Sequence, residues 1–368
     1  MTCLNSVNMN KRIILLFLFF NLHMAVSQDC TLPQELWGSW TSTNLGTIVV
    51  TGTSPSLTFT KLFTAQTVSA NGMECRFTSG TKYILESKYQ IETFSSTNPI
   101  FMWMCLDLRR ASAYSYYYYL NSPVEFGFDG YRIVGLPNTS ITVSDVCTEA
   151  PDTAEFNTMV KDGFETDAVN AVQCADPVLG SFSYTYTDDS GVTSCENANS
   201  SFINACDDSN RTHILVNNSD CVAINPFFST SGRLGCIANV YDSSSDVYYI
   251  SLYNLDSSPT IQFICTAVTK SSNGTVYLSM KQTDCDSNQS PTTAPIGGAT
   301  MVLSAHYTCT STDTELDSKS TNLKWLYILL ACLCLLITCI IVSLYIYRGT
   351  KRKSRRNAVG DVEVAYSN

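Results

Sequence analysis

The sequence contains little histidine, which limits the catalytic sites that it can build. Only three of the 368 residues are histidine, and one of them, His23, lies close to the N-terminus. Serine and cysteine nucleophiles most often need a histidine base beside them, yet neither His213 nor His306 is accompanied by a Gly-x-Ser-x-Gly motif. We therefore expect His213 to lie in a loop, His306 to pack beside a disulfide, and the chain to have no enzymatic activity and no cofactor.

Metal-binding motifs are missing as well. The chain has no His-Glu-x-x-His motif and no pair of Cys-x-x-Cys motifs of the kind that hold zinc. A segment that starts with Asp284 and Asp286 begins like a calcium-binding EF-hand loop. Its sixth position is Gln289 instead of glycine, and its twelfth is Pro295 instead of glutamate. These departures exclude an EF-hand, and we expect no metal site.

Charged residues are few, at 15% of the chain, and they are unevenly distributed. The net charge of −10 argues against a nucleic-acid partner. Residues 28–322 hold 13 basic and 30 acidic side chains, a net of −17, whereas residues 348–368 hold 6 basic and 2 acidic, a net of +4. This asymmetry indicates that the two parts face different compartments.

Two long apolar runs explain the asymmetry. Lys11 and Arg12 precede an apolar run at 13–20, and small residues follow at Ala25 and Ser27, so residues 1–27 are typical of a secretory signal peptide. The alternative, an N-terminal membrane anchor, needs a longer apolar run.

The second run, 325–347, contains no charged residue and spans roughly 34 Å as a helix, enough to cross a bilayer. Aromatic residues stand at both of its ends, and six basic residues follow it in the tail 348–368. Basic residues beside a span stay in the cytoplasm. The sequence therefore predicts a single-pass type I protein of the plasma membrane, with its N-terminus outside.

Cysteines and glycosylation motifs agree with this topology. Of 16 cysteines, Cys3 lies in the predicted signal and three lie in the predicted span, which leaves an even number outside. In an oxidising compartment we expect these twelve to form six disulfides, largely within three sets of four and with the pairing inside each set left open. The three sets are Cys30, Cys75, Cys105 and Cys147; Cys174, Cys195, Cys206 and Cys221; and Cys236, Cys265, Cys285 and Cys309. Six Asn-x-Ser/Thr motifs predict glycosylation at Asn138, Asn199, Asn210, Asn217, Asn273 and Asn288.

The exterior part is expected to be mainly β. Segments rich in Val, Ile, Thr, Tyr and Phe, several of them alternating with period two, are separated by Gly, Asn, Asp, Ser and Pro, and no long amphipathic helix occurs. The predicted fold is a set of disulfide-stapled antiparallel β modules plus one transmembrane helix. The expected order is a signal peptide (1–27), a first module (28–150), an acidic linker (151–173), a second module (174–228), a third module (229–310), a stalk (311–324), the span (325–347) and the basic tail (348–368).

The starts of these modules resemble one another. The segment from Cys30 to Gly38-Ser-Trp40 is similar to that from Cys174 to Gly180-Ser-Phe182, and Leu234-Gly235-Cys236 is a weaker third example. Glycine permits a bend and the aromatic residue closes one end of a sheet. We favour a common way of starting a strand over a true duplication.

The tyrosine-rich segment 113–121 predicts a strand with two different faces. Tyr114, Tyr116, Tyr118 and Leu120 would point into the core. Tyr117 and Tyr119 would lie on the other face, together with smaller and polar residues, where tyrosines are favourable at binding sites. They are the candidate binding surface, although cover by a neighbouring module or a glycan is the more ordinary alternative.

The cysteine order and small apolar motifs resemble a family of cysteine-rich, mostly invertebrate, single-pass membrane proteins with tandem extracellular domains of unknown function. The resemblance covers most of 28–286 and is carried by the Leu-Trp-Gly-Ser-Trp stretch and by the cysteines of all three sets. Where the family has a Cys-x-x-Cys near the end of its first domain, this chain has Cys105 alone. The resemblance implies architecture and topology but no activity.

The sequence thus predicts a cell-surface protein that binds an extracellular protein, glycan or small ligand and takes part in recognition or adhesion. Gly38-x-Trp40 also resembles the motif that opens lipocalin barrels, which hold one apolar ligand inside eight strands. The alternative is therefore lipocalin-like binding of a small apolar molecule by the first module.

Overall fold

The computed structural model describes residues 28–310 apart from 53–54, 63–71, 89, 91–99, 126–129, 138–139, 197–199 and 288, and all of these belong to one compact unit. The predicted signal peptide, stalk, transmembrane helix and tail lie outside the described residues, as do the predicted glycosylation sites Asn138, Asn199 and Asn288. None of the helices in the described part has the length and apolar character needed to cross a membrane.

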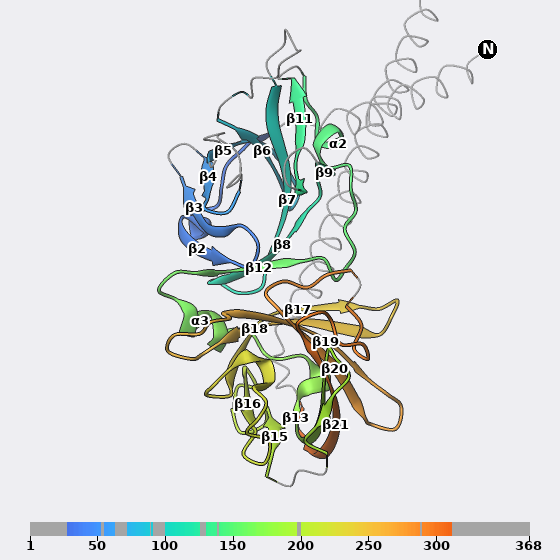
Figure 1. Cartoon of the computed structure of the whole chain (residues 1–368). Coiled ribbons are helices and arrows are strands. Elements are labelled where there is room, and N and C mark those ends of the chain that lie inside the picture. The colour runs from blue at the N-terminus through green and yellow to red at the C-terminus, as the bar shows by residue number, and fades with distance from the viewer. Residues whose placement is uncertain are drawn as a thin grey trace, which may run out of the picture. The chain divides into compact units, whose positions relative to one another are not determined.

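Eight antiparallel strands of the N-terminal half close into a first barrel (Figure 1). The last strand of the barrel pairs with both its predecessor and the first strand, which closes the sheet. In order, the strands are β2 (Gly38–Ser42), β3 (Gly46–Thr51), β4 (Ser56–Phe59), β5 (Gly72–Ser79), β6 (Lys82–Ser87), β7 (Ile100–Arg110), β8 (Ser115–Leu120) and β12 (Asn157–Lys161). Two short strands extend the barrel sheet, β1 (Gln28–Asp29) beside β5 and β11 (Val134–Pro137) beside β7. β9 (Val124–Glu125) and β10 (Tyr131–Arg132) form a separate two-stranded sheet, and the helix α2 (Val143–Val146) follows β11.

The interior of the first barrel is filled by side chains that alternate along its strands. In β3, Ile48 and Val50 are buried and Val49 between them is exposed, as the period of a strand requires. A 3-10 helix, η1 (Gln34–Leu36), lies just before β2. The carbonyl of Leu36 accepts a 2.7 Å hydrogen bond from Nε1 of Trp40, which is completely buried. This tryptophan fixes the start of β2 against the barrel core.

A second barrel of eight antiparallel strands follows the same plan. The 3-10 helix η3 (Asp176–Val178) leads into its first strand, which carries Gly180-Ser-Phe182 and pairs with the last strand to close the sheet. The strands are β13 (Gly180–Asp188), β15 (Phe202–Asn204), β16 (His213–Asn217), β17 (Arg233–Asp242), β18 (Val247–Asn254), β19 (Phe263–Lys270), β20 (Val276–Gln282) and β21 (Ala299–Thr308), with β14 (Thr193–Ser194) added beside β13 and η4 (Pro226–Phe228) between β16 and β17.

The barrels replace the three expected modules. Residues 174–228 and 229–310 contribute to one closed sheet, because β16 pairs with β17 across the expected boundary. The expected linker, 151–173, contains β12 and the helix α3 (Glu165–Asn170). The repeated motif at Trp40 and Phe182 marks the first strand of each barrel, whereas Leu234-Gly235-Cys236 lies inside β17. The two resembling segments therefore do stand at equivalent places in a repeated architecture.

All twelve cysteines pair, as predicted, but not strictly within the three sets. Four bonds lie within a set: Cys30–Cys75, Cys105–Cys147, Cys195–Cys221 and Cys265–Cys285. Two bonds, Cys174–Cys236 and Cys206–Cys309, join the second set to the third. These two links follow from the closed second barrel, because closure brings segments that are far apart along the chain close together in space.

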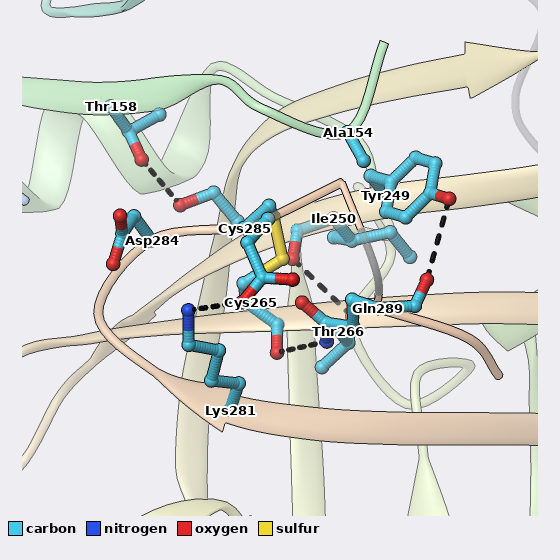
Figure 2. Close-up of a disulfide and its surroundings, with 12 residues drawn as sticks. Ala154, Thr158, Tyr249, Ile250, Cys265, Thr266, Lys281, Asp284, Cys285 and Gln289 are labelled. Atoms are coloured by element: carbon cyan, nitrogen blue, oxygen red, sulfur yellow. Dashed lines mark hydrogen bonds and ion pairs between the residues drawn. A yellow bond between two sulfur atoms is a disulfide. The ribbon is translucent and has the colours of Figure 1, made fainter. Parts of the chain in front are cut away.

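The outer face of β12 connects the two barrels. Thr158 of β12 and Ser251 of β18 are both buried, and their hydroxyls form a 2.7 Å hydrogen bond (Figure 2). Nearby, Ala154 shares a buried cluster with Tyr249 and the disulfide-bonded Cys265 and Cys285. A second shared cluster joins the β12 and α3 region to β17, β18 and β19. The barrels are thus packed on each other by apolar side chains and at least one buried hydrogen bond.

Candidate ligand pocket between the barrels

A pocket of about 570 Å³ lies where the first barrel meets the second. Strands β6, β7 and β8 and the segment 150–153 form one side, and the end of β17 forms the other. This volume falls within the range of sites for small molecules. The side chains that matter for its chemistry are Lys82, Arg109, Tyr117, Tyr119, Asn121 and Asn239.

Both tyrosines that the sequence analysis singled out line this pocket. Their rings contact each other edge to face at 6.2 Å, and the ring of Tyr117 also meets Phe156 at 5.8 Å. Tyr117 is half-buried, whereas Tyr119 is only 6% exposed and donates a 3.0 Å hydrogen bond to the carbonyl of Thr153. Burial, followed by the nearby Tyr117, raises the pKa of Tyr119 to about 12.

The expectation for this strand holds for the core face but needs correction at two positions. Tyr116, Tyr118 and Leu120 are buried in the core of the first barrel, as predicted. Tyr114 is not, because β8 begins at Ser115 and the Tyr114 ring stacks instead on Phe164 at 4.8 Å. Tyr119 is not on a wet face either, since the segment before β12 and the second barrel cover it.

Of the charged side chains that β6 and β7 contribute to the pocket, two are paired with each other and one is not. Asp107 is buried and accepts hydrogen bonds from Thr81 Oγ1 at 2.6 Å and from Arg109 Nη2 at 3.2 Å. The guanidinium of Arg109 also lies 5.3 Å from the centre of the Tyr119 ring, at cation–π distance. The hydrogen bond to Asp107 is the main cause that raises the pKa of Arg109. Lys82, by contrast, forms no ion pair with any residue of the described part of the chain.

Two asparagines that line the pocket have a side-chain oxygen without a hydrogen-bond donor among the described residues. Asn121 is 6% exposed, and its buried Oδ1 accepts no hydrogen bond from the described residues. Asn239 donates from Nδ2 to the carbonyl of Gln173 at 2.5 Å, but its buried Oδ1 is likewise without a donor there. A buried polar atom without a partner costs about 1–3 kcal/mol. Both oxygens are thus buried acceptors without a donor among the described protein groups.

Sequence reasoning found the tyrosines of this site but missed its polar members. Lys82, Asn121 and Asn239 stand on three separate segments and carry no motif. The only signal in the sequence is indirect: in a run of tyrosines on one strand, every second side chain must point away from the barrel core.

Two smaller pockets have a different character. One of about 380 Å³ is lined by Asp284, Asp286 and Glu155, among others, and corresponds to the segment that begins like a calcium loop. Its carboxylates are engaged: Asp286 pairs with Lys281 at 2.7 Å and Glu155 with Arg132 at 3.3 Å. Among the described residues, no group of three or more His, Cys, Asp or Glu is placed to hold a metal ion.

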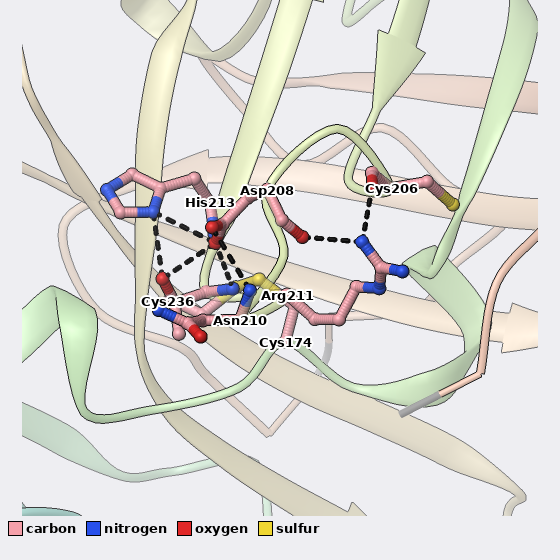
Figure 3. A network of polar contacts seen from close by, with 8 residues as sticks. Cys174, Cys206, Asp208, Asn210, Arg211, His213 and Cys236 are labelled. Atoms are coloured by element: carbon pink, nitrogen blue, oxygen red, sulfur yellow. Dashed lines mark hydrogen bonds and ion pairs between the residues drawn. A yellow bond between two sulfur atoms is a disulfide. The ribbon is translucent and has the colours of Figure 1, made fainter. Parts of the chain in front are cut away.

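The other, of about 300 Å³, is lined by Asp208 and His213. Asp208 organises the loop that leads into β16 (Figure 3). Its Oδ2 accepts hydrogen bonds from the backbone N–H of Thr212 at 2.7 Å, from the Thr212 hydroxyl at 2.9 Å and from the backbone N–H of His213 at 3.2 Å. Burial alone would raise the pKa of Asp208, but the hydrogen bonds from Thr212, from the backbone of Asn210 and from the His213 side chain outweigh it and lower the pKa to about 2. The carboxylate holds a loop together, and its Oδ2 also lies 3.2 Å from Nδ1 of His213, which is the first residue of β16 instead of a loop residue.

Replacing Asp208 by alanine is expected to lower the free energy of unfolding at pH 7 by about 2 kcal/mol, since a pKa held below its ordinary value stabilises the fold by about 1.4 kcal/mol per pH unit. Because the folded pKa is the lower one, this stabilisation is complete above about pH 4 and is lost as the pH falls toward 2. Urea titrations at pH 7 and pH 3 measure it. The exposed neighbour Asp207 is the control: Asp207→Ala should change stability by less than about 0.5 kcal/mol, and an equal loss in both variants would contradict the assignment.

The described glycosylation motifs lie at the surface to different degrees. Asn210 and Asn273 are exposed, and Asn217 is half-buried at the end of β16. His306 is exposed near the end of β21, three residues before Cys309.

Comparison with known proteins adds one match. A family model described as a domain of unknown function (DUF7042) matches residues 172–302, about a third of the chain. The match begins just before η3 and ends within β21, so it covers the second barrel as one piece instead of the two modules expected there. It is consistent with a resemblance to an uncharacterised family. No curated protein and no solved structure gives a significant match to this chain.

Proposed function

We propose that this chain is a binding protein whose two barrels hold an extracellular ligand between them. The observation that carries the proposal is the pocket at the junction, where a half-buried tyrosine, a lysine without an ion pair among the described residues and two asparagines line one volume of about 570 Å³. Ligand sites are commonly concave, lie between domains and combine aromatic surface with a few polar groups. Binding, and not catalysis, fits a site without a nucleophile beside a free base.

The proposal includes the topology expected from the sequence. The protein would be a type I glycoprotein of the plasma membrane, held by the span 325–347, with both barrels outside the cell. Support comes from the charge asymmetry, the basic residues after the span and the six disulfides, because disulfides persist in oxidising compartments. In this setting the ligand would be met in the extracellular space or on a neighbouring cell.

A second candidate is lipocalin-like binding inside the first barrel. Its support is the architecture: eight antiparallel strands closed between β2 and β12, with Gly38-Ser-Trp40 after a 3-10 helix. Against it stands the packing of the inward-facing side chains, since Trp40, Phe59 and Tyr118 are each fully buried against their neighbours. The pocket between the barrels is therefore preferred as the ligand site.

Capture experiments with fragment 28–322 test the preferred site. Used as bait against cell-surface and secreted proteins, the fragment should retain a partner, and Tyr117→Ala should reduce the affinity for it at least about tenfold, as expected when an aromatic contact residue is truncated. The ring of Tyr117 also packs on Phe156 and Tyr119, so a moderate loss of stability of about 1–2 kcal/mol is expected and should be measured separately.

The matched control is Tyr277→Ala, a half-buried tyrosine of β20 that does not line the pocket. It should leave the affinity unchanged while removing a ring of the same size. A partner that binds the original fragment and both variants equally would show that the ligand site lies elsewhere.

A further inference from the structure

We propose that Glu86 is a buried proton-binding site of the first barrel, which takes up a proton when its surroundings become mildly acidic and thereby makes the barrel harder to unfold. The site lies on β6, away from the pocket between the barrels, and the inference does not depend on what that pocket binds. It follows from three features of this carboxylate: its complete burial, an oxygen without a donor, and a second carboxylate directly opposite.

Glu86 lies on a covered outer face of the barrel sheet. Leu85, the residue before it, packs into the barrel core, whereas Ile84, which points the same way as Glu86, belongs to a separate cluster outside the barrel together with Trp103. Glu86 itself is 0% exposed. An ionised carboxylate in such surroundings is unfavourable unless protein groups replace the water that it has lost.

The protein groups around Glu86 replace that water only in part. Its Oε2 accepts a hydrogen bond from Nε of Arg76, but its Oε1 is buried and has no donor among the described residues. Trp103 stands directly opposite on β7, and its buried Nε1 is likewise without an acceptor in the described part of the chain. Since an ionised carboxylate can accept several hydrogen bonds, one donor leaves the charged form of Glu86 poorly stabilised.

A second carboxylate competes for the same arginine. Glu74 is directly opposite Glu86 on β5, and Arg76 also forms an ion pair with it, with Nη1 at 3.4 Å from Oε2. Like charges directly opposite each other in a sheet are destabilising. The side chains of Glu74 and Arg76 are 39% and 43% exposed, so water screens their charges, whereas Glu86 has no such screening. Glu86 is therefore the carboxylate of this pair that gains most from a proton.

The other charged groups near this face are turned to solvent. Lys88, two residues further along the chain, is exposed. On the outer side, α2 contributes apolar side chains to the cluster around Trp103. The acidic residue of this helix, Asp145, is exposed and accepts a hydrogen bond from the backbone N–H of Thr142 at 2.8 Å. Among the described residues, Arg76 is thus the cation that offsets the charge of Glu86.

The direction of the pH effect follows from these contacts. Burial is the main cause that raises the pKa of Glu86 above its ordinary value, Glu74 adds to it, and Arg76 opposes it in part. Because the folded pKa is the higher one, stability increases as the pH falls through it and is fully gained below the ordinary value of about 4.5. Asp208, whose pKa is about 2, acts in the opposite direction only below about pH 4. Measurements between pH 7.5 and pH 5.0 therefore separate Glu86 from it.

Thermal melting of the purified full-length chain in a neutral detergent, followed by circular dichroism, tests the proposal. The change in Tm from pH 7.5 to pH 5.0 should be more positive by at least about 2 °C in the unchanged chain than in Glu86→Gln, which has no proton to bind at this position. Comparing the two pH responses keeps the test valid if glutamine itself alters stability. The comparison also cancels the histidines, which titrate in this range in both proteins.

Two control variants separate burial from ordinary titration. Glu149→Gln changes an exposed glutamate and should keep the pH response of the unchanged chain. Glu74→Gln should keep most of it, because burial and not the neighbouring carboxylate is the main cause at Glu86. If Glu86→Gln responds to pH as the unchanged chain does, or if Glu149→Gln loses as much of the response as Glu86→Gln, the proposal is wrong.

Trp103 provides a local readout of the proton. The chain has only four tryptophans, so the indole N–H signals of a chain labelled with ¹⁵N-tryptophan are few, and Trp103→Phe identifies the one that belongs to Trp103. As the direct cross-strand neighbour of Glu86, this indole should shift between pH 7.5 and pH 5.0 in the unchanged chain and stay in place in Glu86→Gln. A Trp103 signal that does not move, or that moves equally in Glu86→Gln, would show that the proton binds elsewhere.

Discussion

Replacing Trp40 by alanine is expected to lower the free energy of unfolding by about 3–5 kcal/mol, the range for a large aromatic side chain removed from a core. The Trp40 side chain is completely buried, donates to the carbonyl of Leu36 at 2.7 Å and meets Tyr116 edge to face at 5.4 Å. The variant leaves a large cavity at the start of β2 and removes the donor that Leu36 uses. Chemical denaturation followed by far-ultraviolet circular dichroism measures the loss without depending on tryptophan fluorescence.

Trp37, three residues earlier, is the matched control. It is 40% exposed, although its Nε1 also donates to a backbone carbonyl, that of Leu32 at 3.1 Å. Trp37→Ala should therefore lose only about 1 kcal/mol. Phe182 occupies the equivalent position in the second barrel and is 1% exposed, so Phe182→Ala should match the Trp40 variant in size. A Trp37 variant as unstable as the Trp40 variant would contradict this account of the barrel start.

The strands that could be predicted are those with one face in a barrel core and one face toward water. In β8 the alternation correctly places Tyr116, Tyr118 and Leu120 inside. β12 has no such signature: Met159 packs into the first barrel, while Thr158 and Val160 are buried toward the second. A strand covered on both faces loses its alternation, which is why the sequence, with acidic residues on both sides of this segment, predicts a linker there.

Closure of the barrels could not be predicted from cysteine spacing. The twelve cysteines divide evenly into three sets along the chain, but pairing depends on which strands become neighbours. Cys174, before the first strand of the second barrel, reaches Cys236 on β17, 62 residues away. Spacing carries no information on where a sheet closes, whereas the two Gly-Ser-aromatic segments did mark the first strand of each barrel.

The binding site shows the same limit. Tyr117 and Tyr119 stand out because four aromatic residues in succession cannot all enter one core. The groups that give the pocket its chemistry, Lys82 on β6, Asn121 after β8 and Asn239 on β17, meet only through the packing of two barrels. No local pattern connects them. In this chain, the sequence marks the pocket between the barrels only by tyrosines that do not fit the core of their own barrel.

The second large effect is expected for the disulfide Cys206–Cys309. It joins residues 103 positions apart, and loop-closure entropy predicts that a bond across about 100 residues contributes about 4–5 kcal/mol. The bond also fastens the end of β21, the strand that closes the second barrel by pairing with β13, to the loop before β16. Without the bond, the unfolded chain regains the conformational entropy of the loop between the two cysteines, and this lowers the free energy of unfolding. Urea denaturation of the Cys206→Ala, Cys309→Ala variant should reveal the loss.

Alanine is preferred to serine here because serine at 206 would complete an Asn-x-Ser motif with Asn204 and add a glycosylation site. The matched control removes Cys195–Cys221, which spans 26 positions and joins two half-buried residues. Loop length predicts that this bond contributes roughly 1 kcal/mol less. We expect the Cys206→Ala, Cys309→Ala variant to be the less stable of the two. The reverse order would mean that the end of β21 is held by strand pairing alone and that the long loop contributes little to the stability of the second barrel.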